Sequence, residues 1–235
     1  MLPKAFPPLR ILASLVMAAA TCVVAHAAEP AAPVPATTTG VTAAFAHPGV
    51  MHTSEDLARI KAHLQQAPWS AGYLALKNDH YSSLTYQIRG GHCAKVVRDT
   101  PAQCMGEFND DANAAYQQSL MWALSGDARY ATKAIGILNA WSGTLKSIEG
   151  HDAPLAAGLN GFKFAAAAEL IRYTKAGWSA HDIAAAEAMF RNVFYPVIKD
   201  FAPYANGNWD SSCMKAMMAI GVFTDDWGLF NRSLD

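Results

Sequence analysis

FNDDANAAYQQSLMWALSGDARYATKAIGILNAWSGTLK, residues 108–146, holds two apolar patterns of helical period, one on each side of Gly126-Asp127. Glycine favours the left-handed conformation that ends a helix, and aspartate is a favoured cap for the next one. The stretch therefore predicts a helix over about 108–124, a tight turn, and a return helix over about 128–146. The side chains spaced for burial are Ala112, Ala115, Tyr116, Ser119, Leu120 and Ala123 in the first helix, and Tyr130, Ala134, Ile137, Leu138, Trp141 and Leu145 in the second.

The same arrangement recurs twice further along the chain. A helix over 155–174 is followed by a turn at 177–179 and a return helix over 181–194, which Pro196 is expected to end. A third unit starts at Asn208 and turns at 224–226. The first helices of these units start about fifty residues apart, a period typical of stacked helical hairpins. Since no stretch shows sustained strand alternation, we expect an all-α fold of antiparallel helical hairpins that curve into a solenoid or close into an (α/α) toroid.

The segment before the first hairpin combines two short helices with an irregular stretch. Thr53 and Asp56 form a capping signal for a helix that stops before Pro68, and a second helix is expected over about 69–79. Residues 81–106 show no regular period.

Cysteine usage indicates an oxidising compartment and argues against a metal site. Cys93 and Cys104 lie in the irregular stretch and are predicted to form a local disulfide, the alternative being two free surface thiols. Cys213 lies in an apolar helical run and is expected to be buried. The chain has no CxxC and no HExxH motif, so we expect neither a zinc site nor another cofactor.

The N-terminus is predicted to be an export signal. Residues 1–27 combine Lys4 and Arg10, a short apolar run, and a small-x-small cleavage site at Ala25-His26-Ala27. The apolar run is too short for a spanning helix, so we expect no stable membrane anchor and a periplasmic or secreted protein. Residues 28–44 read as a linker rich in Pro, Ala and Thr, and residues 45–235 as one folded domain.

The charge balance excludes one class of partner. Removal of residues 1–27 lowers the number of Lys and Arg from 18 to 16 against 19 Asp and Glu, a net charge of −3. A nucleic-acid-binding domain needs a basic face, so nucleic acid is not an expected partner. An acidic ligand is not excluded, because the charge within a cleft matters more than the total.

Several stretches resemble the alginate-lyase-like family of polysaccharide lyases. They are FAHPGV at 45–50, ALSGDARYA at 123–131, LNAWS at 138–142, and NGNWD at 206–210 followed by MMAIGVF at 217–223. The resemblance covers essentially the whole folded domain. The Gly-Asp hairpin motif is common among helical proteins, whereas the Asn-x-Asn-Trp stretch is moderately specific. The resemblance implies an incomplete (α/α) toroid with a cleft for an acidic polysaccharide substrate.

The resemblance also implies β-elimination at a uronic acid, without a catalytic metal. In this family an Asn commonly binds the uronate carboxylate, and Tyr, often with His and Arg, transfers the protons. The Asn role falls on Asn208, with Asn206 as second choice. In one branch of the family His directly follows this Asn, whereas Trp209 stands here, which leaves the base unassigned and favours a relative with another uronan preference. The Tyr and Arg would lie beyond residue 235.

Other residues are candidates for substrate binding, each with a simpler alternative. Asn208 could only cap the following helix, Trp209 and Tyr204 could only pack, and Asp210 could only stabilise the helix dipole. The equivalent ends of the preceding hairpins offer further polar side chains that could form substrate subsites: Asn160, Lys163, Asn113 and Gln117.

Three functions follow from these patterns. The first is a lyase acting on alginate or a related uronan, with residues 45–235 expected to be the N-terminal part of a longer protein, or else a short chain whose open end a dimer covers. The second is a glycoside hydrolase, for which Asp210 with Asp110 or Asp111 is the plausible carboxylate pair. The third is a non-catalytic, helical-repeat protein of the periplasm that binds a glycan.

Overall fold

The computed structural model describes residues 44–202, 204–205 and 207–234. The predicted export signal, nearly all of the predicted linker, and Asn206 lie outside these residues. The described residues are mostly helical, which confirms the predicted all-helical class in its main point.

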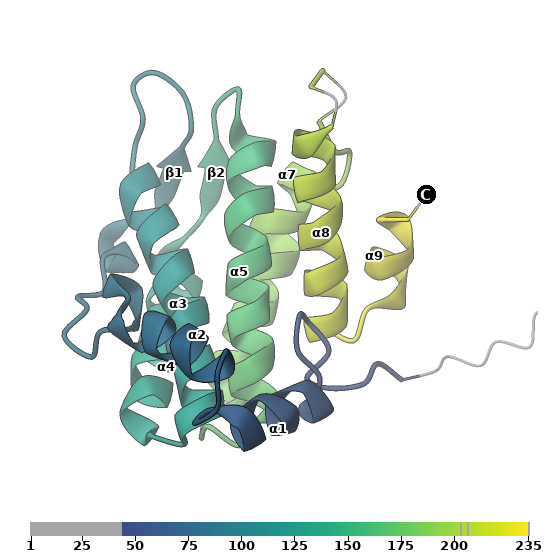
Figure 1. The fold of residues 1–235 in the computed structure, drawn as a ribbon. Coiled ribbons are helices and arrows are strands. Elements are labelled where there is room, and N and C mark those ends of the chain that lie inside the picture. Colours follow the sequence, from purple (N-terminus) through teal and green to yellow (C-terminus); the bar gives the residue numbers. More distant parts are fainter. Residues whose placement is uncertain (1–43, 203, 206, 235) are drawn as a thin grey trace, which may run out of the picture. The chain divides into compact units, whose positions relative to one another are not determined.

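Three long helices, α3 (Met105–Ser125), α5 (Ala153–Tyr173) and α8 (Asn208–Phe223), stand side by side in one layer (Figure 1). Hydrogen bonds fix their relative register. In the N-terminal halves of α5 and α3, Asn160 Nδ2 donates to Asn109 Oδ1 at 2.8 Å. Near their last turns, Trp122 Nε1 donates to Thr174 Oγ1 at 2.8 Å and Arg172 donates to the Phe223 carbonyl at 2.8 Å. The three helices therefore run in the same direction, with equivalent positions at the same level.

A second set of helices packs behind this layer (Figure 1). Helix α4 (Ala128–Thr144) follows the predicted turn, in which Gly126 has a φ of 72° and the Asp127 carboxylate caps α4 through the Arg129 N–H. Helix α6 (Ala180–Met189), capped by Ser179, packs against α4 and continues through a π-helical turn, η3 (Phe190–Phe194), into α7 (Tyr195–Ile198). A short helix, α9 (Trp227–Arg232), follows α8.

Small side chains allow α3, α5 and α8 to approach one another closely. Alanines and glycines together occupy most of the buried positions of α5, and a Cβ placed on Gly158 would lie 2.5 Å from Ser212 Oγ of α8. Aromatic rings fill the space between the two layers, where Phe108, Trp141, Phe164 and Phe194 are fully buried and in mutual contact. The six residues of α4 and its end that the sequence predicts to be buried are all buried.

The segment before α3 packs on this helical body. Helix α1 (Ser54–His63) carries the predicted capping box of Thr53 and Asp56, and α2 (Trp69–Asn78) follows it. The predicted irregular stretch contains two 3-10 turns, η1 (His80–Ser82) and η2 (Gly90–His92), and a short strand, β1 (Lys95–Val97). This strand pairs in parallel with β2 (Ser147–Glu149), which lies between α4 and α5, so that Val96 stands opposite Ile148.

Two expectations from the sequence are wrong in detail. The sequence predicts no strand, whereas the structure contains β1 and β2. Each has three residues, too few to produce a recognisable alternation, although Val96 and Ile148 are both buried. Pro196 does not end the return helix. It lies in the first turn of α7, directly after the π-helical turn η3. A wider turn relieves the clash between a proline ring and the carbonyl of the preceding turn, so the helix continues past the proline.

Candidate functional site

The stretch that carries the predicted catalytic amide lies at the start of α8. Gly207, whose φ is 83°, is the N-cap, and Asn208 is the first residue of the helix. The interpretation of Asn208 as the cap is therefore wrong. A glycine has no side chain with which to cap the helix, and the Asn208 side chain is exposed. The second candidate amide, Asn206, lies outside the described residues.

Two aromatic side chains accompany Asn208. Tyr204 is exposed, and its hydroxyl donates to the His151 carbonyl at 2.7 Å. Its ring meets that of Trp209 edge to face, with centroids 6.0 Å apart, and lies 5.0 Å from the His151 ring. These contacts join the loop before α8 to the loop before α5, so both loops lie at the N-terminal ends of the parallel helices.

The Asp210 carboxylate has a structural partner. Its Oδ1 accepts a hydrogen bond from the Ala202 N–H at 2.9 Å, which holds the loop before α8 against the first turn of that helix. A carboxylate in this position also interacts favourably with the positive end of the helix dipole.

The polar residues predicted on α3 and α5 have different surroundings. Asn160 is buried between the two helices and donates to Asn109 and to the Ala156 carbonyl, so its side chain has no access to a substrate. Gln117 is half-buried and accepts a hydrogen bond from the Ser82 hydroxyl at 2.9 Å. Asn113, one turn before Gln117, is half-buried.

Lys163 lies one turn beyond Leu159 on the same face of α5 and is half-buried. Burial lowers the pKa of its ammonium group, and the nearby positive charge of Lys215 lowers it further. Lys215 belongs to α8 and places its Nζ 4.1 Å from the centroid of the Phe162 ring. The sequence patterns did not predict Phe162 or Lys215 as candidates for binding, although Lys215 is the one charged residue in the apolar run 214–223.

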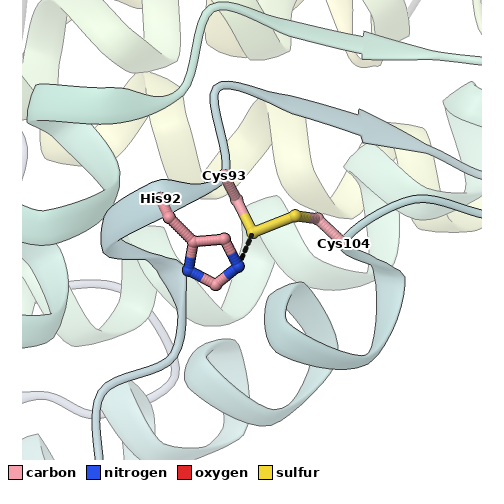
Figure 2. Close-up of side chains that lie close together, drawn as sticks. All are labelled: His92, Cys93 and Cys104. Carbon is pink, nitrogen blue, oxygen red and sulfur yellow. Dashed lines mark hydrogen bonds between the residues drawn. A yellow bond between two sulfur atoms is a disulfide. The ribbon is translucent and has the colours of Figure 1, made fainter.

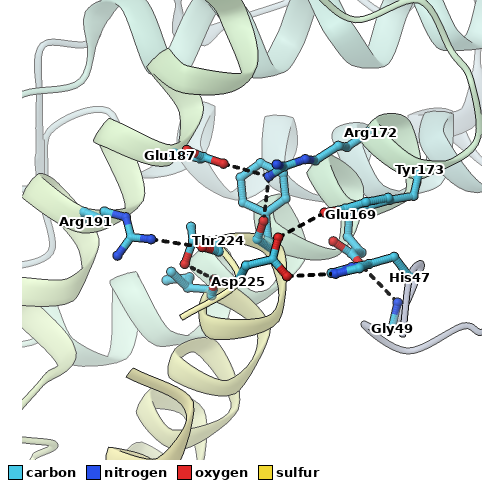
Figure 3. Close-up of polar contacts among 11 residues, drawn as sticks. His47, Gly49, Glu169, Arg172, Tyr173, Glu187, Arg191, Thr224 and Asp225 are labelled. Atoms are coloured by element: carbon cyan, nitrogen blue, oxygen red, sulfur yellow. Dashed lines mark hydrogen bonds and ion pairs between the residues drawn. The ribbon is translucent and has the colours of Figure 1, made fainter. Parts of the chain in front are cut away.

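A network of charged side chains occupies the opposite end of the layer (Figure 3). His47 lies between two carboxylates, with Nδ1 2.6 Å from Glu169 Oε1 and Nε2 3.0 Å from Asp225 Oδ1. Its ring stacks on Tyr173 at a centroid distance of 3.9 Å. Glu169 is fully buried, and burial raises the pKa of its carboxyl group, against the opposing effects of His47, the Gly49 N–H and Arg172.

This network cannot serve directly as a catalytic carboxylate pair. Glu169 has no exposed surface, and the space between it and Asp225 is filled by the His47 ring. The network instead binds the segment before α1 to α5 and to the turn after α8. Local sequence patterns do not reveal this network, because Glu169 and Asp225 lie 122 and 178 residues from His47.

The carboxylates proposed for a hydrolase are engaged in structural contacts. Asp111 is buried and accepts hydrogen bonds from the Tyr86 hydroxyl, the Trp141 indole and the Gly90 N–H. Asp110 forms an ion pair with Arg89 and accepts a hydrogen bond from the Tyr81 hydroxyl at 2.8 Å. Together with the contact of Asp210, these bonds leave little support for a pair of acidic catalysts.

Cys93 and Cys104 are joined by a disulfide with an S–S distance of 2.10 Å (Figure 2). His92 Nε2 lies 3.7 Å from Cys93 Sγ, so three side chains of metal-binding type lie close together. Both sulfurs are bonded to each other, so neither is available as a thiolate ligand. Cys213 is a free thiol and is buried, as expected.

Comparison with known proteins assigns the family. The family model for alginate lyase matches residues 54–235. The chain therefore belongs to the alginate lyase family, in agreement with the resemblance seen in its motifs. Searches of curated proteins and of solved structures give no significant match.

The family implies a polysaccharide as the substrate. Among residues 44–202, 204–205 and 207–234, no helix is both long enough and apolar enough to cross a membrane.

Proposed function

We propose that this chain contributes to a polysaccharide lyase that cleaves alginate or a related uronan by β-elimination. The family match over residues 54–235 carries the proposal. The exposure of Asn208 at the start of α8, beside Trp209 and Tyr204, supports it, because binding groups on a rigid helical scaffold gather in such loops.

β-Elimination makes a specific demand that Asn208 can meet. The C5 proton of a uronate is barely acidic while the neighbouring carboxylate is charged, so the enzyme must stabilise the enediolate that forms when a base removes this proton. An amide group donates two hydrogen bonds and does not compete as a base. The first N–H groups of α8 lie beside it and favour an anion, because they have no partner within the helix.

The remaining parts of the proposal concern what surrounds this amide. Trp209 and Tyr204 offer aromatic surface for a sugar ring. We propose that α3, α5 and α8 belong to the inner ring of an (α/α) toroid made of antiparallel hairpins, and that Tyr, His or Arg residues transfer the protons. We also propose that the protein acts in the periplasm or outside the cell, after removal of residues 1–27.

The test uses the mature protein expressed from its complete gene, incubated with alginate, with glucuronan and with a neutral glucan. A lyase yields products with a C4–C5 double bond, which absorb ultraviolet light and are one water lighter than the hydrolysis products of equal length. Saturated products would instead establish a glycoside hydrolase, and binding of a uronan without turnover would establish a glycan-binding protein. Absence of both turnover and binding with every uronan would overturn the proposal.

A further inference from the structure

We propose that Lys163 and Lys215, together with the Phe162 ring, form a subsite that binds the carboxylate of a second uronate residue of the polymer. This inference rests on the proposed function, because it names how a uronan chain would be held away from the reacting residue. It begins from the observation that the two lysines come from neighbouring helices, and that Lys215 Nζ of α8 lies over the ring of Phe162, the residue next to Lys163 on α5.

The position of Lys215 relative to Asn208 follows from helix geometry. Seven residues separate them on α8, which is close to two complete turns, so both side chains lie on the same face of the helix. The rise along the axis is about 10 Å. Ser211, one turn after Asn208, is exposed on this same face. A polymer that lies along this face of α8 would therefore meet the amide first and the ammonium group two turns later.

Among the described residues, neither ammonium group pairs with a carboxylate. The lysines that do so are Lys95 and Lys199. Lys163 has lost part of its hydration through burial and also faces the like charge of Lys215, so its protonated form is destabilised. A bound carboxylate would restore a favourable environment for both groups.

The surface beside the lysines suits the rest of a sugar residue. Lys215 Nζ lies over the Phe162 ring at 4.1 Å, an arrangement that fixes the direction of the ammonium group. Next to it is an apolar pocket of about 240 Å³, which includes Met218, Val222 and the backbone of Gly49. Carbohydrate sites commonly combine an apolar surface for the ring with a few polar groups that fix its orientation.

The experiment measures the affinity of the mature protein for a uronate oligosaccharide by titration calorimetry at low ionic strength. We expect the double variant Lys163→Met/Lys215→Met to bind about tenfold more weakly, since each charge-assisted hydrogen bond contributes to affinity. The matched control is Lys77→Met, which removes an exposed lysine of α2 and should leave the affinity unchanged. Lys215→Arg keeps the charge and should retain most of the affinity.

Two further measurements separate this subsite from the lyase proposal. A carboxyl-reduced oligosaccharide should bind the wild-type protein at least as weakly as the uronate oligosaccharide binds the double variant, because it also lacks the carboxylate that Asn208 would bind. The double variant should bind the reduced oligosaccharide no more weakly than the wild type does. In turnover, the double variant should raise KM with little change in kcat. Equal uronate affinity for wild type and double variant would overturn the subsite, whether or not the protein is a lyase. Weakened binding by a protein that shows no turnover would support the subsite and overturn the lyase. If the double variant does not fold, the single variant Lys215→Met, at an exposed position, replaces it in the affinity measurement. An unchanged affinity of this single variant would also contradict the subsite.

Discussion

His47 Nδ1 lies 2.6 Å from Glu169 Oε1, and this contact joins the segment before α1 to a buried position near the end of α5. Glu169 Oε1 also accepts the Gly49 N–H at 2.9 Å, whereas its second oxygen has no hydrogen-bond partner among the described residues. A buried carboxylate that is only partly satisfied is costly, which explains why burial is the largest cause of its raised pKa.

The raised pKa of Glu169 predicts a particular pH dependence of stability. A carboxyl group that holds its proton more tightly in the folded state stabilises that state fully below its ordinary pKa of 4.5. This stabilisation is lost as the pH rises through the higher pKa of the folded state. The free energy of unfolding of the wild type, relative to Glu169→Gln, should therefore fall as the pH rises above 4.5. The loss is about 1.4 kcal/mol for each unit by which the pKa is raised.

Urea denaturation of both proteins at several pH values measures this difference, and the comparison cancels groups that titrate alike in both. A difference that is independent of pH, or that grows towards neutral pH, would contradict the raised pKa.

Gly158 predicts how closely α5 and α8 pack. A Cβ at this position would lie 2.5 Å from Ser212 Oγ and 2.8 Å from the Ser212 carbonyl carbon, which is backbone and cannot easily move. Gly158→Ala should therefore destabilise the protein by about 1–3 kcal/mol, despite the higher helix propensity of alanine. Gly72 of α2 is the matched control, because a Cβ there meets nothing within 4 Å. Gly72→Ala should be neutral or stabilise by up to about 1 kcal/mol. Thermal unfolding of both variants makes the comparison, and similar effects would show that α5 and α8 are not in this close contact.

The disulfide between Cys93 and Cys104 predicts a redox-dependent stability. It closes a short loop between η2 and the start of α3, which restricts the unfolded chain. Cys93→Ser/Cys104→Ser should lower the free energy of unfolding by about 2–3 kcal/mol. A reductant should lower the melting temperature of the wild type to that of this variant. Cys213→Ala removes the buried free thiol and should retain the response to reductant. A wild-type melting temperature that is insensitive to complete reduction would rule out the contribution of the disulfide.

Local signals in the sequence predicted the helices well. The capping box at Thr53, the turn at Gly126 and the cap at Ser179 each depend on residues a few positions apart, and each is found in the structure. Apolar periodicity also predicted the buried face of α4, because a long amphipathic helix repeats its pattern several times. Sequence periodicity did not predict the strands β1 and β2, since three residues are too few to show a period.

The candidate site was less predictable because its contacts are not local. Asn160 and Lys163 belong to the same helix and are three residues apart, yet Asn160 is buried against α3 while Lys163 is half-buried and influenced by Lys215 of α8. Which side of α5 faces which neighbour depends on the register of three helices, and no single stretch of sequence contains that information. The His47–Glu169 contact depends on the same register.

The role of Asn208 makes the most direct prediction about catalysis. If its amide stabilises the enediolate, Asn208→Ala should lower kcat about 10²–10³-fold, the range found when one donor to a developing oxyanion is removed. Asn208→Asp should be at least as damaging, because a second negative charge would face the uronate carboxylate. Asn78→Ala, which removes an exposed amide at the end of α2, is the control and should retain full activity. Initial rates of product absorbance with the mature protein from the complete gene give kcat and KM. An Asn208→Ala enzyme with wild-type kcat would exclude this amide from the reaction and leave α8 with only a structural role at that end.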